Sequence, residues 1–210
     1  MALYLDSADV DDARRAAALG FVAGATTNPL LIARSGRPAE KVVADLCAAL
    51  PGAIFHQVTA LPGPALDDEI ARFRAISERV AFKIPCTLDY LQALHTLARQ
   101  NVTCAVTAVY SPAQAYIAAE AGARYVIPYV NRATRLCGDG SALVAELAAI
   151  LNGRSCEILA ASIKDPAEAA ATLLAGAMHL TLPWDVLAAL AAHRLTDLAL
   201  EEFRRAGEKA

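Results

Sequence analysis

Residues 80–108, VAFKIPCTLDYLQALHTLARQNVTCAVTA, contain two short apolar runs separated by an amphipathic segment. The runs Val80–Ile84 and Val102–Ala108 have the length and composition of buried strands. The segment Leu88–Gln100 has apolar residues at the spacing of a helix that packs one face on a core. The same alternation recurs along the whole chain, which predicts a parallel sheet whose strands are connected by helices.

The predicted strands are the short apolar runs Leu3–Leu5, Val22–Ala25, Ile54–Val58, Val80–Ile84, Val102–Ala108, Tyr125–Pro128, Ile158–Ala160 and His179–Leu182. The predicted helices are the amphipathic segments Val10–Leu19, Pro38–Leu50, Pro64–Ser77, Leu88–Gln100, Pro112–Ala121, Ser141–Leu151, Pro166–Ala175 and Pro183–Ala191, followed by one near Thr196–Arg205. Eight strand–helix units in about 200 residues predict one (β/α)8 TIM barrel over residues 1–210, with 196–210 as an extra C-terminal helix. The alternative is an open doubly wound sheet, but the first strand runs into Asp6-Ser7-Ala8-Asp9 where that fold needs a glycine-rich loop.

Composition narrows the possible partners and the cellular location. The net charge is −3 and no run of Lys or Arg occurs, which argues against binding to nucleic acid or to an anionic membrane. The N-terminus lacks the pattern of a signal peptide, and no uninterrupted apolar span reaches roughly 18 residues. Five cysteines lie far apart without a C-x-x-C pair, and the histidines lack metal-ligand spacing. We therefore expect a cytoplasmic protein without a metal or an organic cofactor.

Lys83 lies inside the first quoted run, between Phe82 and Ile84. Lysine is rarely buried without a partner or a function, because moving an ammonium group out of water is costly. An apolar setting lowers the pKa of a lysine, and the neutral amine can then form a Schiff base with a carbonyl substrate. The alternative is a lysine near a strand end that reaches into water.

In a (β/α)8 barrel, functional side chains gather at the carboxyl ends of the strands. The polar residues at or just after those ends are Asp6, Thr26, Thr27, Asn28, His56, Gln57, Thr59, Lys83, Thr107, Tyr110, Tyr129, Asn131, Arg132, Ser162, Lys164, Thr181 and Asp185. One strand lysine, an interior carboxylate, several hydroxyls and an arginine favour carbonyl chemistry on a phosphorylated substrate.

Several of these residues also have simpler interpretations. Asp6 could cap the following helix, and Thr26 to Asn28 could form a turn before Pro29. Arg132 could be a solvated loop charge, as could Arg135. Lys164 is a rival nucleophile, but its place beside Asp165-Pro166 is typical of a loop or a helix start. Gln57 is harder to explain in this way, because an amide inside an apolar strand needs hydrogen-bond partners.

The motifs at the strand ends are Leu3-Tyr4-Leu5-Asp6-Ser7-Ala8-Asp9, Thr26-Thr27-Asn28-Pro29, Phe82-Lys83-Ile84-Pro85-Cys86-Thr87, Thr107-Ala108-Val109-Tyr110, Pro128-Tyr129-Val130-Asn131-Arg132 and Leu159-Ala160-Ala161-Ser162-Ile163-Lys164. In this order and spacing the sequence resembles the small transaldolases, and in particular their fructose-6-phosphate aldolase branch. The resemblance implies a class I aldolase barrel whose Schiff-base lysine, on the fourth strand, is Lys83 and not Lys164.

Two positions distinguish the branches of this family. The resemblance implies a glutamate on the third strand and a phenylalanine after the sixth in true transaldolases, and glutamine and tyrosine in the aldolases. This chain has Gln57 and Tyr129, as the aldolases do. It departs from the aldolase branch at Ile127, where a small alanine is common, so we expect a changed pocket for the donor ketone.

We assign roles on this basis as hypotheses. Lys83 forms the Schiff base, while Asp6 assists proton transfer near it. Tyr129, with Gln57 and Thr107, positions a water molecule at the enamine carbon. The residues expected to bind sugar hydroxyls and the phosphate are Thr26, Asn28, Arg132 and Ser162.

Other functions stay open at this stage. The expected reaction is the cleavage of fructose 6-phosphate to dihydroxyacetone and glyceraldehyde 3-phosphate, and the alternative is transaldolase activity. A catalytically silent barrel that senses sugar phosphates is a third possibility. The resemblance also implies that the C-terminal helix, 196–210, packs on a neighbouring subunit in a homo-oligomer, a pentamer or a decamer. The alternative is an ordinary helix that covers the barrel of its own chain.

Overall fold

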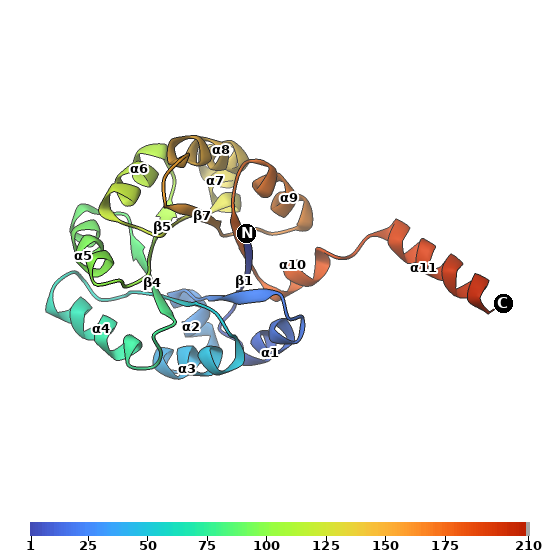
Figure 1. The fold of residues 1–210 in the computed structure, drawn as a ribbon, viewed down its shortest axis with the longest axis horizontal. Helices are drawn as coiled ribbons and strands as arrows, with labels where there is room; N and C mark the ends of the chain where they lie inside the picture. The colour runs from blue at the N-terminus through green and yellow to red at the C-terminus, as the bar shows by residue number, and fades with distance from the viewer. Residues whose placement is uncertain (209–210) are drawn as a thin grey trace.

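The computed structural model describes residues 1–208 and contains a closed barrel of eight parallel strands (Figure 1). The strands are β1 Ala2–Asp6, β2 Val22–Thr26, β3 Ile54–Gln57, β4 Val80–Pro85, β5 Cys104–Val109, β6 Tyr125–Pro128, β7 Glu157–Ala160 and β8 His179–Leu182. Each strand pairs with its sequence neighbours, and β8 pairs with β1 to close the barrel. The predicted (β/α)8 TIM barrel is therefore confirmed.

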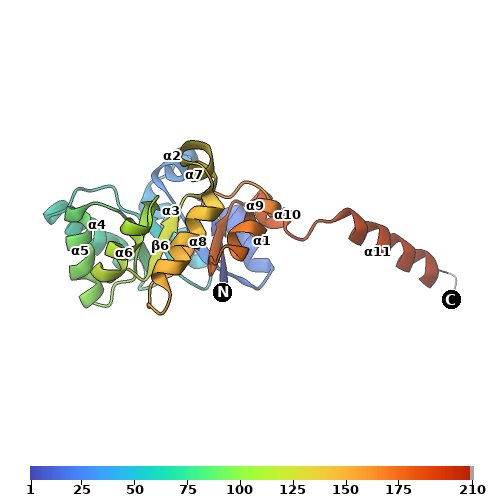
Figure 2. The ribbon, with the colours of Figure 1, turned by 90° about the horizontal axis from the view of Figure 1, so that it is seen from above.

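The described helices lie around the barrel, except for the last one, which extends away from it (Figures 1 and 2). They are α1 Val10–Ala18, α2 Pro29–Ser35, α3 Ala39–Ala49, α4 Pro64–Arg74, α5 Leu88–Arg99, α6 Pro112–Ala121, α7 Val130–Cys137, α8 Gly140–Leu151, α9 Pro166–Leu174, α10 Trp184–Ala189 and α11 Arg194–Gly207. Within residues 1–208, no helix combines the length and the hydropathy needed to cross a membrane.

Two short helices, α2 and α7, were not predicted. α2 begins right after Asn28, whose side-chain oxygen accepts hydrogen bonds from the N–H groups of Leu30 and Leu31, each at 3.0 Å. It ends at Gly36, which adopts a left-handed conformation with φ of 64°. A helix of seven residues is too short to show a clear periodicity, although Asn28-Pro29 and Gly36 are typical start and stop signals.

The second unpredicted helix, α7, follows β6 directly and changes the position of Arg132. The sequence allowed Arg132 and Arg135 to be loop charges, whereas both lie in α7. The helix has no side-chain cap at its start, so the usual start signal of a helix is missing from the sequence. Arg132 is thus held by a helix at the mouth of the barrel.

The barrel interior explains how the strands present their polar side chains. One core cluster, inside the barrel, includes Tyr4, Phe55, Ala81, Ala105, Ile127, Leu159 and Ala161. Side chains two positions apart on a strand share a face. Residues two positions after members of this cluster, in strand order, are Asp6, Gln57, Lys83, Thr107, Tyr129 and Ala161. These residues therefore form the layer above the packed interior.

α11 differs from the other helices because it lies apart from the barrel (Figures 1 and 2). An extended segment connects it to α10, and none of its described residues is buried. Its bounds, Arg194–Gly207, begin slightly earlier than the predicted Thr196–Arg205. The last two positions of the predicted C-terminal segment, 209 and 210, lie outside the described residues.

Candidate functional site

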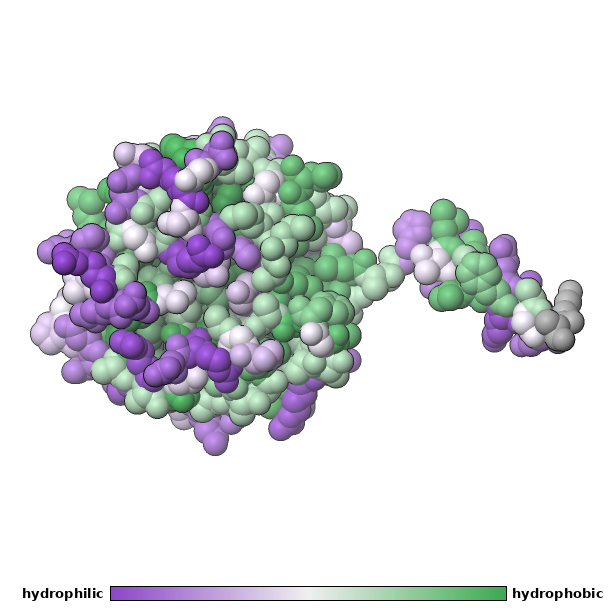
Figure 3. Space-filling model, in the orientation of Figure 1, coloured by the Kyte–Doolittle hydropathy of each residue, from purple (hydrophilic) through white to green (hydrophobic). Residues whose placement is uncertain are grey.

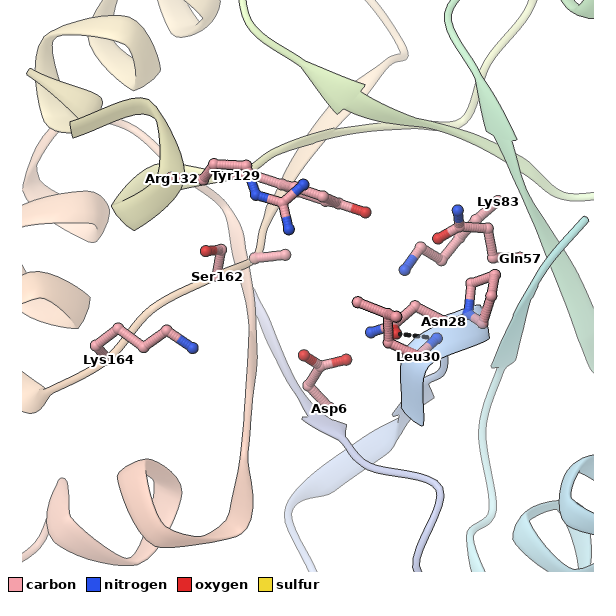
Figure 4. A pocket seen from close by; sticks show the side chains of 11 residues that line it. Asp6, Asn28, Leu30, Gln57, Lys83, Tyr129, Arg132, Ser162 and Lys164 are labelled. Atoms are coloured by element: carbon pink, nitrogen blue, oxygen red, sulfur yellow. Dashed lines mark hydrogen bonds between the residues drawn. The ribbon is translucent and has the colours of Figure 1, made fainter. Parts of the chain in front are cut away.

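A cavity of about 330 Å³ opens at the carboxyl ends of the barrel strands (Figure 4). The residues that line it are Asp6, Asn28, Pro29, Leu30, Gln57, Lys83, Tyr129, Arg132, Ala161, Ser162 and Lys164. All of the predicted site residues except Thr26 and Thr107 are in this set. In Figure 4, Lys83, Gln57 and Asn28 lie on one side of the cavity, and Arg132, Ser162 and Lys164 lie on the other.

Lys83 is buried at the base of this cavity, with 2% of its surface exposed. Its amine donates a hydrogen bond to the carbonyl oxygen of Thr27 at 2.9 Å. Burial lowers the pKa of Lys83 to about 8, although the nearby carboxylate of Asp6 acts in the opposite direction. A substantial fraction of this amine is therefore neutral near neutral pH, as a nucleophile requires.

Asp6 points into the cavity from the end of β1. Its carboxylate accepts a hydrogen bond from the Thr26 hydroxyl at 2.8 Å, and Thr26 in turn lies 2.7 Å from the Thr181 hydroxyl. Burial raises the pKa of Asp6, while the charge of Lys83, the Thr26 hydrogen bond and the charge of Lys164 oppose the rise. The simpler interpretation of Asp6 as a helix cap does not apply, because Asp9 caps α1.

Thr26, predicted to bind substrate, is fully buried and does not line the cavity. It acts from behind Asp6, whose carboxylate it orients. A period-two strand pattern identifies the face on which a side chain lies, but it does not show whether that side chain reaches the cavity or supports a neighbour.

Tyr129 follows β6 and directs its ring into the cavity (Figure 4). Its hydroxyl lies 3.0 Å from the hydroxyl of Thr107, which is itself buried outside the cavity lining. Burial raises the pKa of Tyr129, and the Thr107 hydrogen bond only partly opposes this effect. The phenol therefore stays protonated at neutral pH and can act as a proton donor or hold a water molecule.

Gln57 is the neighbour of Lys83 across the paired strands β3 and β4. Its side-chain oxygen is buried and has no hydrogen-bond partner among the described residues. Buried amide oxygens are usually hydrogen-bonded, so this atom is available to a ligand or to water. An amide can orient a water molecule but cannot take a proton from it at neutral pH.

Asn28 combines a structural role with a place in the cavity lining. Its side-chain oxygen is used to cap α2, as the dashed line to Leu30 in Figure 4 shows. The amide nitrogen is the group left to donate a hydrogen bond to a ligand. Both interpretations of Asn28 from the sequence are thus compatible with the structure.

The opposite wall of the cavity is cationic. The Arg132 guanidinium carbon lies 4.9 Å from the centre of the Tyr129 ring, and this stacking orients the group. Ser162 has a φ of 61°, a left-handed conformation that residues other than glycine rarely adopt. Lys164 directs its amine toward the same space (Figure 4). Such a set can bind an anion such as a phosphate group.

Lys164 is a charged residue of the cavity lining for which the sequence predicted no role. It immediately precedes the cap of α9, and its backbone N–H donates to Glu168 at 2.7 Å. Glu168 also accepts a hydrogen bond from the Asn131 side chain at 3.1 Å, which ties this loop to α7. The available signal was the position of Lys164 two residues after Ser162. Its place beside a helix start favoured a structural role instead.

Ile127, expected to reshape the donor pocket, is fully buried in the barrel interior and does not line the cavity. It lies two positions before Tyr129 on the same face of the chain. The structure therefore places Ile127 in the packing beneath the site and not in the wall of the cavity.

The fold and the cavity together define a barrel with a buried lysine amine at one end of the site and cationic groups at the other. The family model described as Transaldolase/Fructose-6-phosphate aldolase matches residues 3–210. The chain therefore belongs to the transaldolase/fructose-6-phosphate aldolase family, which is a family of enzymes.

Curated relatives cover the chain at full length. A probable transaldolase of Geobacter metallireducens is 36% identical over 211 residues, covering 100% of this chain and 99% of that protein. A probable transaldolase of Desulfosudis oleivorans is 36% identical over 212 residues, with the same coverage of both chains. A probable transaldolase of Geotalea uraniireducens is 37% identical over 211 residues, again covering 100% and 99%.

Proposed function

We propose that this protein is a class I aldolase that reversibly cleaves fructose 6-phosphate to dihydroxyacetone and glyceraldehyde 3-phosphate. The proposed nucleophile is Lys83, whose buried amine lies at the base of the cavity. The cationic wall opposite it suits the phosphate of the substrate. The cytoplasmic location and the absence of a cofactor stay predictions.

The proposed reaction begins when the neutral amine of Lys83 attacks the ketone carbon. Loss of water from the resulting carbinolamine gives an iminium ion, and Asp6 assists the proton transfers around it. The C3–C4 bond then breaks as the C4 hydroxyl loses its proton. The electron pair of the C3–C4 bond moves into the iminium to form an enamine, and glyceraldehyde 3-phosphate leaves. Protonation of the enamine carbon and hydrolysis release dihydroxyacetone and restore the amine.

The pairing of Gln57 with Tyr129 is the observation that favours an aldolase. An aldolase must protonate its enamine, and the raised pKa of Tyr129 keeps a proton available in the cavity that Lys83 also lines. Gln57 orients a water molecule without removing its proton. A transaldolase must instead keep the enamine unprotonated until a second aldose arrives.

Transaldolase activity is the second candidate, because the three relatives described above are named probable transaldolases. The two functions share the Schiff base and differ in the fate of the enamine. A paired assay separates them: purified protein is incubated with fructose 6-phosphate, with and without erythrose 4-phosphate. Free dihydroxyacetone formed without the acceptor supports the aldolase. Sedoheptulose 7-phosphate formed only with the acceptor contradicts it and identifies a transaldolase.

The pH dependence of the reaction follows from the lowered pKa of Lys83. Below pH 8 most of the amine is protonated and cannot attack a ketone, whereas above pH 8 most of it is neutral. We expect kcat/KM for fructose 6-phosphate to rise with pH through a midpoint near pH 8 and to level off about one pH unit above it. Initial rates between pH 6 and pH 9.5 measure this, and a profile that is flat from pH 6.5 upward contradicts it.

The cationic wall makes a separate prediction about the phosphate. Arg132→Ala and Lys164→Ala should each raise KM for fructose 6-phosphate about 10- to 100-fold, because each removes a charged hydrogen-bond donor. The control is aldol addition of dihydroxyacetone to unphosphorylated glyceraldehyde, whose rate should change little. Equal losses in the two reactions would show that these residues do not recognise phosphate.

We also propose that α11 packs on a neighbouring subunit of a homo-oligomer, a pentamer or a decamer. Its large apolar side chains are exposed, with Phe203 at 69% and Leu195 at 66% (Figure 3). Exposed apolar faces of this kind are typical of interfaces. Leu198→Asp combined with Phe203→Asp should lower the molar mass in analytical ultracentrifugation. An unchanged mass, or a monomeric wild-type protein, would refute the proposal.

A further inference from the structure

The carboxylate of Glu69 on α4 is buried beneath the loop that follows β3, outside the lining of the catalytic cavity. Only 3% of Glu69 is exposed. It accepts hydrogen bonds from His56 Nε2 at 2.9 Å, Thr59 N at 3.0 Å and Ala60 N at 2.8 Å. The Thr59 hydroxyl donates a further bond at 3.2 Å. Burying a carboxylate is costly unless its oxygens are hydrogen-bonded, so this site is built around the charge.

Glu69 is ionised in this setting. Burial acts to raise the pKa of Glu69, but the hydrogen bonds from His56, Ala60 and Thr59 outweigh burial and lower the pKa to about 2. Because an ionised carboxylate only accepts, His56 donates its Nε2 proton to Glu69. The imidazole also stacks on Phe73, with ring centres 3.6 Å apart. His56 is therefore fixed both by a charged partner and by an aromatic ring.

The bonds to Glu69 hold the chain on both sides of Gln57. His56 precedes Gln57 on β3, and Thr59 and Ala60 follow it in the next loop. Neighbouring residues on a strand point to opposite faces, so His56 faces α4 while Gln57 faces Lys83. Fixing His56 outside the barrel thus fixes the direction of Gln57 inside it.

The pairing of β3 with β4, which includes a bond from Val58 N to the Lys83 carbonyl at 3.0 Å, also holds this backbone, but no side-chain hydrogen bond among the described residues directs the Gln57 amide oxygen. Besides the catalytic cavity, Gln57 lines a second cavity of about 280 Å³, whose walls include His56, Glu69 and Phe73. Gln57 thus lines both cavities, and the backbone at the end of β3 determines which of them its side chain faces.

We propose that Glu69 and His56 are positioning residues that hold the Gln57 amide toward the enamine carbon, an inference that rests on the function proposed above. In the step affected, the water held by Tyr129 and Gln57 gives one proton to that carbon and takes up the phenol proton of Tyr129, and solvent then returns a proton to the phenolate. The enamine electrons form the new C–H bond, and the nitrogen returns to an iminium ion. Schiff-base formation at Lys83 precedes this step and does not use Gln57.

The test compares His56→Phe and Glu69→Ala with a matched control, His179→Phe. His179 makes the same kind of bond, from Nε2 to Glu157 at 3.0 Å. His179 and Glu157 are the first residues of β8 and β7, at the opposite end of the barrel from the catalytic cavity. Loss of the control pair therefore perturbs a buried imidazole without moving Gln57.

Two readouts use dihydroxyacetone as the probe. Borohydride trapping measures the Schiff base, and NMR in D₂O measures exchange of the carbon-bound hydrogens of dihydroxyacetone. In His56→Phe and Glu69→Ala we expect exchange to fall about 10- to 100-fold, because a small misplacement of an orienting group has effects of this size. The trapped fraction of these two variants should match that of the wild type. The control His179→Phe should match the wild type in both readouts.

Thermal unfolding identifies which variants fold, and either folded variant decides the outcome. Wild-type exchange in a folded variant overturns the proposal. In a Gln57→Ala background, adding His56→Phe should change exchange by less than about twofold, and a larger additional loss would show that His56 does not act through Gln57. Failure to trap any Schiff base in the wild type would instead refute the proposed function.

Discussion

Replacement of Lys83 by methionine is expected to reduce cleavage of fructose 6-phosphate by about 10⁴- to 10⁶-fold, the scale seen when a covalent nucleophile is removed. Methionine has no nucleophilic atom for the ketone, and no iminium can form to accept the electrons of the breaking bond. Its unbranched side chain suits the apolar surroundings of a residue that is 2% exposed, so the barrel should stay folded. Steady-state rates and thermal unfolding of the variant measure both expectations.

Lys164→Met is the matched control for this prediction, because Lys164 is the other lysine that lines the cavity. Lys164 is exposed, and no aldol step is assigned to it. We expect Lys164→Met to raise KM with little change in kcat. A Lys83→Met protein that still cleaves fructose 6-phosphate, or a Lys164→Met protein that does not, would reassign the nucleophile.

Tyr129→Phe is expected to lower the release of dihydroxyacetone by about 10²- to 10⁴-fold, the usual contribution of a positioned proton donor. The variant keeps the ring that stacks with Arg132 and loses only the hydroxyl that bonds Thr107. Since Lys83 and Asp6 are unchanged, the enamine should still form and should persist longer before it is protonated. Product analysis by chromatography measures this loss.

A longer-lived enamine has a second consequence. With erythrose 4-phosphate present, Tyr129→Phe should transfer a larger share of its dihydroxyacetone units to the acceptor than the wild type does. Thr107→Val is a graded control, because it removes the partner of the Tyr129 hydroxyl and leaves the hydroxyl itself. If Tyr129→Phe releases dihydroxyacetone at the wild-type rate, the assignment of Tyr129 as proton donor is wrong.

The barrel could be predicted because its determinants are local. Each strand is a short apolar run and most helices are long enough to show a periodic apolar face, as Leu88–Arg99 does. Parallel strands need helical connections, so eight strands that alternate with helices along the chain are compatible with only a few topologies. The helices α2 and α7 were not predicted, because a helix of two turns is too short for its periodicity to be recognised. Tertiary contacts decide whether such a helix forms.

Lys83 and Gln57 could be predicted as site residues because a polar side chain inside an apolar strand is unusual on its own. The functions of Thr26 and Thr107 were harder to assign, since their hydroxyls support Asp6 and Tyr129 from outside the cavity. Lys164 was not predicted to bind substrate, because its placement depends on the path of a loop, which Glu168 fixes from α9. Contacts between distant segments of this kind leave no periodic pattern in the sequence.

The proposed mechanism depends on a covalent bond between Lys83 and the substrate ketone. The most direct test is to incubate the protein with fructose 6-phosphate, reduce it with borohydride, digest it and sequence the modified peptide by mass spectrometry. We expect one stable adduct, carried by Lys83. An adduct on Lys164 instead, or no adduct in a preparation that turns over fructose 6-phosphate, would contradict it.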